Sequence, residues 1–452
     1  MIAEDQVLDI YFESLGCDKN LVDTEKMLTL LAQEGHRLTD DPGSAQCAVV
    51  NTCCFINDAK TESIEAILGL SEYKASAGLK YLVVVGCLAS RYPDEIIKEI
   101  PEVDAVIAGS RLPLLCECLR RLEKGEKHIV VSGEPSADEK LPEKRLSSTP
   151  VHYTYLKIAE GCDRRCTYCI IPYVKGGYTS FDFDSILEEA RLLEDRGISE
   201  LIVIAQETTR YGIDRYGSKR LPELLRALCA LPFLKWVRVM YCYPEEIDDD
   251  LIEVFKSEKK LCNYIDMPIQ HSSDAVLKRM GRRMTRARLT EIIGRLRSEV
   301  PGISIRTTLL VGFPGETQED FEDLCSFVRE MKFNNLGVFK YSKEENTPAY
   351  GFKEQVKESV KKERYRELMT IARSISKTEK EKIPGSILDV IVDGFDSKKR
   401  MFVGRSYMDA PEIDSVVYFE SDSESLMSGT IVRVRIKQSD DYDLYGTMVG
   451  DR

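Results

Sequence analysis

Three closely spaced cysteines are the strongest chemical signal in this sequence of 452 residues. Cys162, Cys166 and Cys169 lie in the segment GCDRRCTYCIIP and have the spacing CxxxCxxC. Such a loop can give three thiolates to three irons of a 4Fe-4S cube and leave the fourth iron open to a small ligand. A structural zinc site, which is the alternative, needs four closed ligands, and no fourth ligand lies nearby. The spacing therefore predicts a 4Fe-4S cluster with one open iron.

A second set of cysteines is spread more widely along the chain. Cys17, Cys53 and Cys87 each follow the end of a predicted strand, about one strand and helix unit apart. Consecutive parallel strands would bring all three thiolates to the carboxyl edge of one sheet, where open α/β sheets bind ligands. A single cysteine is more often a buried apolar residue. Together they predict a second cluster, and we expect structural roles for the other eight: Cys47, Cys54, Cys116, Cys118, Cys229, Cys242, Cys262 and Cys325.

The amino and carboxylate groups of S-adenosylmethionine (SAM) could chelate the open iron of the CxxxCxxC cluster. Residues near predicted strand ends could hold the rest of that cofactor, and glycines there would let the backbone approach it closely. Each also has an ordinary alternative as a turn or as a satisfied polar residue. The candidate cofactor-binding residues are Tyr168, Gln206, Glu207, Gln270, Gly312 and Gly315.

Three predicted domains position these residues. Residues 1–123 alternate short apolar strands with amphipathic helices, which indicates a parallel α/β sheet. Residues 124–150 lack periodicity and read as a linker. Residues 151–384 contain six strand and helix units, which suggests a partial (βα)6 barrel with functional residues beyond the carboxyl ends of its strands. Residues 385–452 contain about five short strands and predict a small all-β barrel.

The composition favours a soluble enzyme. Hydrophobic residues make up 43% of the chain, and no apolar run is long enough to cross a bilayer. The first residues carry acids where a signal peptide needs a basic head, so we expect a cytoplasmic protein whose cysteines stay reduced. The net charge of −13 opposes non-specific attraction to nucleic acid and favours a basic partner.

The motifs together resemble the methylthiotransferase family of radical SAM enzymes over nearly the whole chain. The resemblance rests on GCDKN, NTC and GCLASRY in the first domain and on GCDRRCTYC and GFPGET in the second, followed by a terminal TRAM barrel. Within the family, LGCDKNLVDTE, IAQETTRYG, PIQHSS, LKRMGR and APEID are similar to the branch that modifies an aspartate β-carbon of small-subunit ribosomal protein twelve. The tRNA-modifying branch, which acts on an adenosine, is the alternative.

The resemblance implies the chemistry and the partners. It implies two 4Fe-4S clusters, two SAM molecules per reaction, a basic ribosomal protein as substrate and a low-potential electron donor such as flavodoxin or ferredoxin. An independent charge argument also makes tRNA a less favoured substrate than a basic protein, because residues 386–452 carry a net charge of −5.

Three positions depart from the family pattern. Asp18 stands where a proline is common, and Glu207 replaces a usual aspartate. The segment KGGYTSF at residues 175–181 replaces a typical RGxxxSR. The loss of two arginines near the expected substrate entrance concerns how the substrate is held and leaves the cluster chemistry intact.

Overall fold

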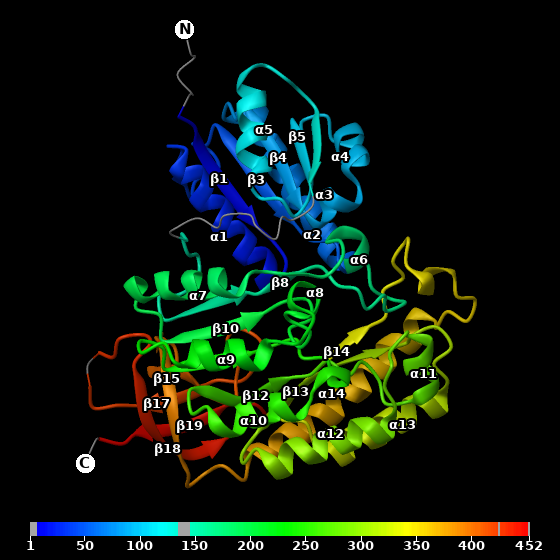
Figure 1. Cartoon of the computed structure of the whole chain (residues 1–452), viewed down its shortest axis with the longest axis vertical. Coiled ribbons are helices and arrows are strands. Elements are labelled where there is room, and N and C mark those ends of the chain that lie inside the picture. The colour runs from blue at the N-terminus through cyan, green and yellow to red at the C-terminus, as the bar shows by residue number, and fades with distance from the viewer. Residues whose placement is uncertain (1–6, 134–144, 424, 451–452) are drawn as a thin grey trace.

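The protein is described here by a computed structural model that covers residues 7–133, 145–423 and 425–450. Three bodies follow one another along the chain. Figure 1 shows the first body, in blue and cyan, above the second, in green to orange, while the C-terminal barrel packs against the lower left of the second. This order confirms the predicted fold class of a parallel α/β domain, a partial barrel and a small all-β barrel.

The first body is a six-stranded parallel sheet with the strand order β2-β1-β3-β4-β5-β6. Alternate residues of β3 and β4 point to opposite faces, so Val50 and Val84 lie in one apolar core and Val49 and Val83 in another. Helices cover both faces, as a parallel sheet requires. Its elements are β1 (Asp9–Ser14), α1 (Asp18–Gln33), β2 (Arg37–Thr39), β3 (Cys47–Thr52), α2 (Asn57–Ser76), β4 (Tyr81–Gly86), α3 (Cys87–Arg91), α4 (Pro93–Glu99), β5 (Ala105–Gly109), α5 (Leu114–Glu123) and β6 (Ile129–Gly133).

The structure corrects the start of the predicted linker. Residues 129–133 form β6, which pairs with β5 as the sixth strand of the first sheet. This edge strand is half exposed, with Val130 41% exposed, and therefore lacks the continuous apolar run that marks a central strand. Residues 134–144 of the predicted linker lie outside the described residues.

The second body is an open sheet of six parallel strands, β14-β13-β12-β11-β10-β7, which confirms the six predicted units. Its elements are β7 (Tyr153–Lys157), β8 (Ala159–Glu160), α6 (Ile171–Val174), β9 (Thr179–Ser180), α7 (Phe183–Leu192), η1 (Glu194–Arg196), β10 (Glu200–Ile204), α8 (Ile213–Tyr216), α9 (Leu221–Cys229), β11 (Trp236–Val239), η2 (Pro244–Glu246), α10 (Asp249–Ser257), β12 (Leu261–Asp266), α11 (Asp274–Arg279), α12 (Arg286–Glu299), β13 (Ser304–Val311), α13 (Gln318–Met331), β14 (Asn335–Lys340), η3 (Pro348–Gly351) and α14 (Glu358–Lys380).

The third body is a closed five-stranded barrel with the order β15-β16-β17-β19-β18. Only β17 and β19 pair in parallel; the other pairs are antiparallel. Its strands are β15 (Ile387–Asp396), β16 (Met401–Ser406), β17 (Val417–Glu420), β18 (Ile431–Ser439) and β19 (Leu444–Met448). No helix in the described part of the chain has both the length and the apolar character needed to span a membrane.

One apolar cluster joins all three bodies. It contains Val22 from α1, Tyr264 from β12 and Ala410 from the segment after β16. Polar contacts reinforce the junction with the barrel, because the Tyr264 hydroxyl donates a hydrogen bond of 2.7 Å to Asp414 and Arg405 pairs with Glu200 at 2.6 Å. The first body and the barrel thus pack on one face of the central sheet.

Candidate active site

The first trio of cysteines lies at the carboxyl ends of three neighbouring strands. Cys17 follows β1, Cys53 follows β3 and Cys87 follows β4, and these strands are adjacent in the sheet. The backbone around them is tight: a Cβ placed on Gly16 would lie 3.2 Å from the Cys53 Sγ. Gly86 has a φ of +91°, and a Cβ there would lie 2.3 Å from the Asn51 side chain. The sheet therefore brings the three predicted residues to one edge.

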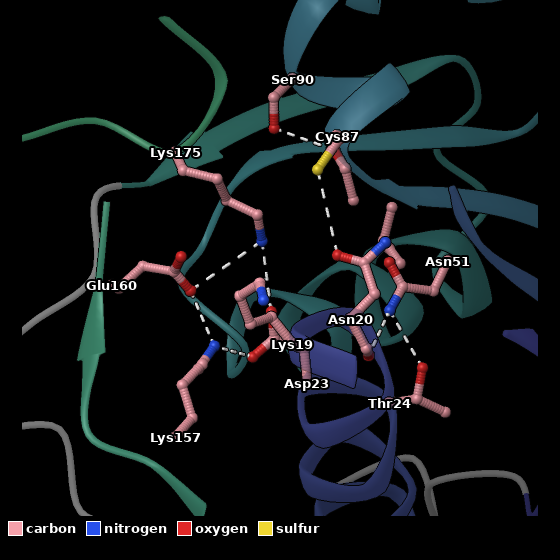
Figure 2. A network of polar contacts seen from close by, with 12 residues as sticks. Lys19, Asn20, Asp23, Thr24, Asn51, Cys87, Ser90, Lys157, Glu160 and Lys175 are labelled. Atoms are coloured by element: carbon pink, nitrogen blue, oxygen red, sulfur yellow. Dashed lines mark hydrogen bonds and ion pairs between the residues drawn. The ribbon is translucent and has the colours of Figure 1, made fainter. Parts of the chain in front are cut away.

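Asn20 ties this edge together, a role that the sequence analysis missed. Its side-chain amide donates hydrogen bonds to the carbonyls of Leu15 and Thr52, at 3.1 Å and 3.0 Å. The Cys87 thiol lies 3.9 Å from the Asn20 Oδ1, and Figure 2 shows Asn20 between Cys87 and Asn51. Asn20 is 1% exposed. Its place in the GCDKN motif was the signal that could have identified it.

The second trio lies on one loop between β8 and α6. Cys162 and Cys166 are buried, and the Cys169 amide donates a hydrogen bond of 3.0 Å to the Cys166 carbonyl. Arg165 has a φ of +49°, and Gly161 has a φ of +73° with no room for a Cβ beside the carbonyl of residue 177. These left-handed residues turn the backbone sharply within the loop that carries the three cysteines.

Both trios suit iron–sulfur cubes by their donor chemistry. All fourteen cysteines are free, so six thiols are available without breaking a disulfide. Burial raises the pKa of the Cys162 thiol to about 12, so a bound cation would have to stabilise its thiolate. Within the described ranges, no group of three or more His, Cys, Asp and Glu side chains could hold one metal ion. Ligands of a cube bind different irons and stand further apart than ligands of one ion, so this finding leaves the cluster prediction open.

The two trios are neighbours across the interface between the first two bodies. Helix α6 begins two residues after Cys169 and packs against α3, which begins at Cys87. Ile170 and Val174 belong to the same apolar cluster as Cys87 and Cys54. An apolar contact therefore joins the two predicted cluster sites.

A buried network of charges crosses the same interface (Figure 2). Lys175 pairs with Asp23 of α1 at 3.2 Å, and Lys157 pairs with Asp23 and, at 2.7 Å, with Glu160. Burial opposes the Glu160 carboxylate, but Lys157 and Lys175 outweigh burial and lower the pKa of Glu160 to about 2. Lys175 is the first residue of the segment that departs from the family pattern. In this structure it is an ion-pair partner that joins the two bodies.

Two predicted cofactor-binding residues follow β10 and contact other groups of the site. The Glu207 carboxylate pairs with both nitrogens of the Arg164 fork, at 2.8 Å and 2.5 Å, and so fixes the cysteine loop. The Gln206 amide donates a hydrogen bond to Glu160, while its carbonyl oxygen is buried without a hydrogen-bond partner in the described part of the chain. The free oxygen of Gln206 suits an amino group, whereas Glu207 is already engaged by Arg164. SAM binding by either residue stays a prediction.

The other predicted cofactor-binding residues lie in the cysteine loop and near the carboxyl ends of β12 and β13. The Tyr168 ring meets Phe313 edge to face with 6.5 Å between ring centroids. Gln270 has a φ of +70° and bridges to β13. Gly312 and Gly315 also have positive φ, and a Cβ there would meet side chains of the protein itself, Lys361 and Arg279. Tyr168 thus packs against Phe313, which is next to Gly312 in the chain, whereas protein side chains fill the space beside both glycines. Contact of the four residues with SAM stays a prediction.

Tyr241 and Arg282 are two further buried or contact-making residues near the site that the sequence analysis did not predict. Tyr241 follows β11 with a φ of +61°, its hydroxyl donates to Asp18 at 3.1 Å, and the Lys19 ammonium lies 3.2 Å from its ring centroid. Arg282 has a side chain that is 2% exposed, and its Nη1 has no hydrogen-bond partner among the described residues. No spacing in the sequence signals either role, because both depend on contacts between distant segments.

Comparison with known proteins agrees with this architecture. The chain matches the uncharacterized protein family UPF0004 over residues 9–108, the radical SAM superfamily over residues 156–328 and the TRAM domain over residues 385–449. Among solved structures, the radical SAM methyltransferase TsrM from Kitasatospora setae, with cobalamin and a [4Fe-4S] cluster bound, has a TM-score of 0.55 at 16% identity and covers 76% of this chain and 74% of its own. This likeness supports the fold.

Curated relatives are far closer in sequence. A ribosomal protein uS12 methylthiotransferase RimO from Lachnoclostridium phytofermentans is 50% identical over 440 residues, which is 97% of this chain and 100% of the relative. The RimO of Caldanaerobacter subterraneus is 47% identical over 96% of this chain and 98% of its own length. The radical SAM match and these relatives thus show a radical SAM enzyme that transfers sulfur-containing groups. The chain belongs to the RimO family of methylthiotransferases, which confirms the family predicted from its motifs.

Proposed function

We propose that this chain adds a methylthio group to the β-carbon of an aspartate in ribosomal protein uS12, using two 4Fe-4S clusters and two SAM molecules. The observation that carries the proposal is the pair of cysteine trios at one interface, on a chain 50% identical to a RimO over its whole length. Each trio leaves one iron of its cube free. One open iron suits SAM, and the other suits a sulfur donor.

Cys162, Cys166 and Cys169 would hold the cluster that binds SAM. This cofactor pair supplies, when reduced, a carbon-centred radical strong enough to remove a hydrogen from an unactivated C–H bond. The chain's own residues would bind and orient the cofactor and the substrate, and would exclude water. Glu207 holds the cysteine loop through Arg164, and Gln206 offers a buried oxygen beside it. Phe313 packs against Tyr168 and would exclude water from that side of the cysteine loop.

Cys17, Cys53 and Cys87 would hold the second cluster, which would supply the sulfur that the substrate receives. Asn20 fixes the loops that carry these cysteines, and the Lys175–Asp23–Lys157 network keeps the first body seated on the second. The distance between a carbon radical and its sulfur partner must be short and constant, because a mobile pair would lose the radical to side reactions. A buried, charge-paired interface supplies that rigidity.

The proposed partners follow from charge and compartment. A protein that lies on ribosomal RNA must carry basic charge, and the C-terminal barrel region of this chain has a net charge of −5. A low-potential donor such as flavodoxin or ferredoxin would supply electrons to the clusters. Fourteen free cysteines suit the reducing cytoplasm.

Anaerobic reconstitution followed by a substrate assay tests the proposal. The purified chain should contain about eight irons and eight sulfides, as two cubes require. With SAM, sulfide and a reductant it should raise the mass of uS12 by about 46 Da, the composition CH2S, at a single aspartate. The same assay on tRNA nucleosides should show no product. Modification confined to tRNA would instead assign the chain to the tRNA branch.

A further inference from the structure

Helix α2 presents an apolar strip to solvent beside the first cysteine trio. Although α2 has 20 residues, only Ser63, Ile67 and Leu70 are buried. Ile64 and Leu68 are 41% and 47% exposed, and residues four apart share one face of a helix. Phe55, just before the helix, is 46% exposed. We define Phe55, Ile64 and Leu68 as the α2 strip.

A row of carboxylates runs beside the α2 strip. Asp58, Glu65 and Glu72 are exposed and follow one another at intervals of seven, which places them along one line of the helix. These acids form no ion pair within the part of the chain that the structure describes. The two lysines of α2 are engaged elsewhere, since Lys60 pairs with Glu344 at 2.9 Å and Lys74 with Asp104 at 2.5 Å. The exposed face of α2 is therefore both apolar and negatively charged.

The buried face of helix α2, which lies opposite the row of carboxylates, fixes the helix beside the first cysteine trio. The Ser63 hydroxyl accepts a hydrogen bond of 3.0 Å from the Cys53 amide and donates one of 2.9 Å to the Cys53 carbonyl. The ion pair of Lys60 with Glu344 joins the start of α2 to the second body. A macromolecule that contacts Phe55 and the start of α2 would thus lie near the interface between the first two bodies.

We infer that the exposed face of α2 is a docking surface for the basic protein substrate. This inference rests on the proposed function and adds the surface that recognises the substrate. The occupant it fits is a protein segment with an apolar side chain flanked by lysines or arginines, because apolar contacts fill the α2 strip and the cations pair with the row of carboxylates. A nucleic acid does not fit, since the unpaired carboxylates repel a phosphate backbone.

Binding of purified uS12 to the reconstituted protein tests this surface. One variant reverses two charges, Glu65→Lys with Glu72→Lys, and a second removes the apolar contacts, Ile64→Ser with Leu68→Ser. The matched control, Glu363→Lys with Glu367→Lys, reverses two exposed acids on α14. We expect both α2 variants to weaken the Kd for uS12 about tenfold or more, and the control to stay within twofold of wild type. Only the charge-reversed variant should also lose the dependence of binding on salt.

Kinetics separates docking from a general loss of structure. Both α2 variants should cleave SAM in the absence of uS12 at the wild-type rate, and KM for uS12 should rise about tenfold with kcat unchanged. If the charge-reversed double variant fails to fold, Glu65→Gln with Glu72→Gln replaces it, and we expect a smaller rise in KM for uS12. If the folded α2 variants bind uS12 as tightly as wild type, the docking surface is wrong. If wild type itself neither binds nor modifies uS12, the proposed function fails instead.

Discussion

Both cysteine trios are predicted to hold a cluster, but one lies on a single loop and the other at the ends of three strands. Cys162, Cys166 and Cys169 lie on one loop, and two left-handed residues of that loop curl it locally. The trio at Cys17, Cys53 and Cys87 exists only because three parallel strands are in register. Closing a short loop costs little chain entropy, whereas the strand-end trio needs the whole sheet. The strand-end trio therefore depends on global stability, and the loop trio depends on its local backbone and on the ion pair of Arg164 with Glu207.

Replacing one cysteine of each trio should have the largest effect. Cys162→Ala should abolish SAM cleavage, because the open iron that binds SAM would be lost, while Cys53→Ala should leave cleavage measurable and eliminate methylthio transfer. Each variant should keep about four of eight irons. Anaerobic iron analysis with assays for 5′-deoxyadenosine and for uS12 mass checks both. Equal loss of SAM cleavage in the two variants, with the remaining cluster intact, would contradict the division of roles.

Glycine substitutions should separate the sheet from the loop. In Gly86→Ala, the new Cβ would lie 2.3 Å from Asn51 and 2.6 Å from the Thr52 carbonyl, so the unfolding free energy should fall by about 3 kcal/mol. In Gly161→Ala the new Cβ would lie 2.1 Å from the Gly177 carbonyl oxygen and 2.7 Å from the Gly176 carbonyl oxygen, so we expect a loss of stability of similar size, about 3 kcal/mol, together with the loss of SAM cleavage. Urea unfolding of both apoproteins measures the stability, and the 5′-deoxyadenosine assay measures the cleavage. Equal loss of SAM cleavage in the two folded variants would remove the distinction between the two sites.

Mild acid should weaken the second body through His271. Burial lowers the pKa of His271 to about 4, whereas the unfolded chain takes up this proton near pH 6.5. Stability is therefore lost as the pH falls from about 6.5 towards 4, and the loss at pH 5 should be about 2 kcal/mol. Urea unfolding at pH 7 and pH 5 measures this change, with His271→Gln as the control that lacks it. A wild-type loss no larger than that of the variant would exclude His271 as the cause.

The smallest effect is expected at the ion pair that joins α2 to the second body. Lys60→Ala should cost less than about 1 kcal/mol, because Lys60 is partly exposed and Arg91 still pairs with Glu344 at 2.7 Å. SAM cleavage should be unchanged, since the loop trio lies on another segment. Thermal unfolding and the 5′-deoxyadenosine assay test both statements. A large loss of cleavage would show that the two sites depend on each other more than their construction suggests.

The fold was predictable where apolar periodicity was strong. Central strands such as β3 and β4 are buried along nearly their full length and read as continuous apolar runs. Edge strands β2 and β6 were missed because their residues are largely exposed and lack that pattern. Burial on both faces therefore decides which strands a sequence reveals.

The site was predictable where one residue type carries the chemistry. Cysteine spacing indicated both trios, because thiolates are specific ligands and strand ends of a parallel sheet meet at one edge. Tyr241 and Arg282 act through contacts with residues far away in the chain, Asp18 for the first and Glu245 for the second. A single sequence holds no pattern for such pairs.

The apolar cluster that Val22, Tyr264 and Ala410 share has a consequence for engineering this chain. Deleting the C-terminal barrel would expose Tyr264 and its neighbours to solvent, so we expect the truncated protein to aggregate rather than fold as a smaller enzyme. A barrel grafted from a distant relative would need matching residues from position 407 to position 414 to restore the apolar interface. The bodies look like separable domains in the sequence, but because they share this apolar cluster we expect them to unfold together.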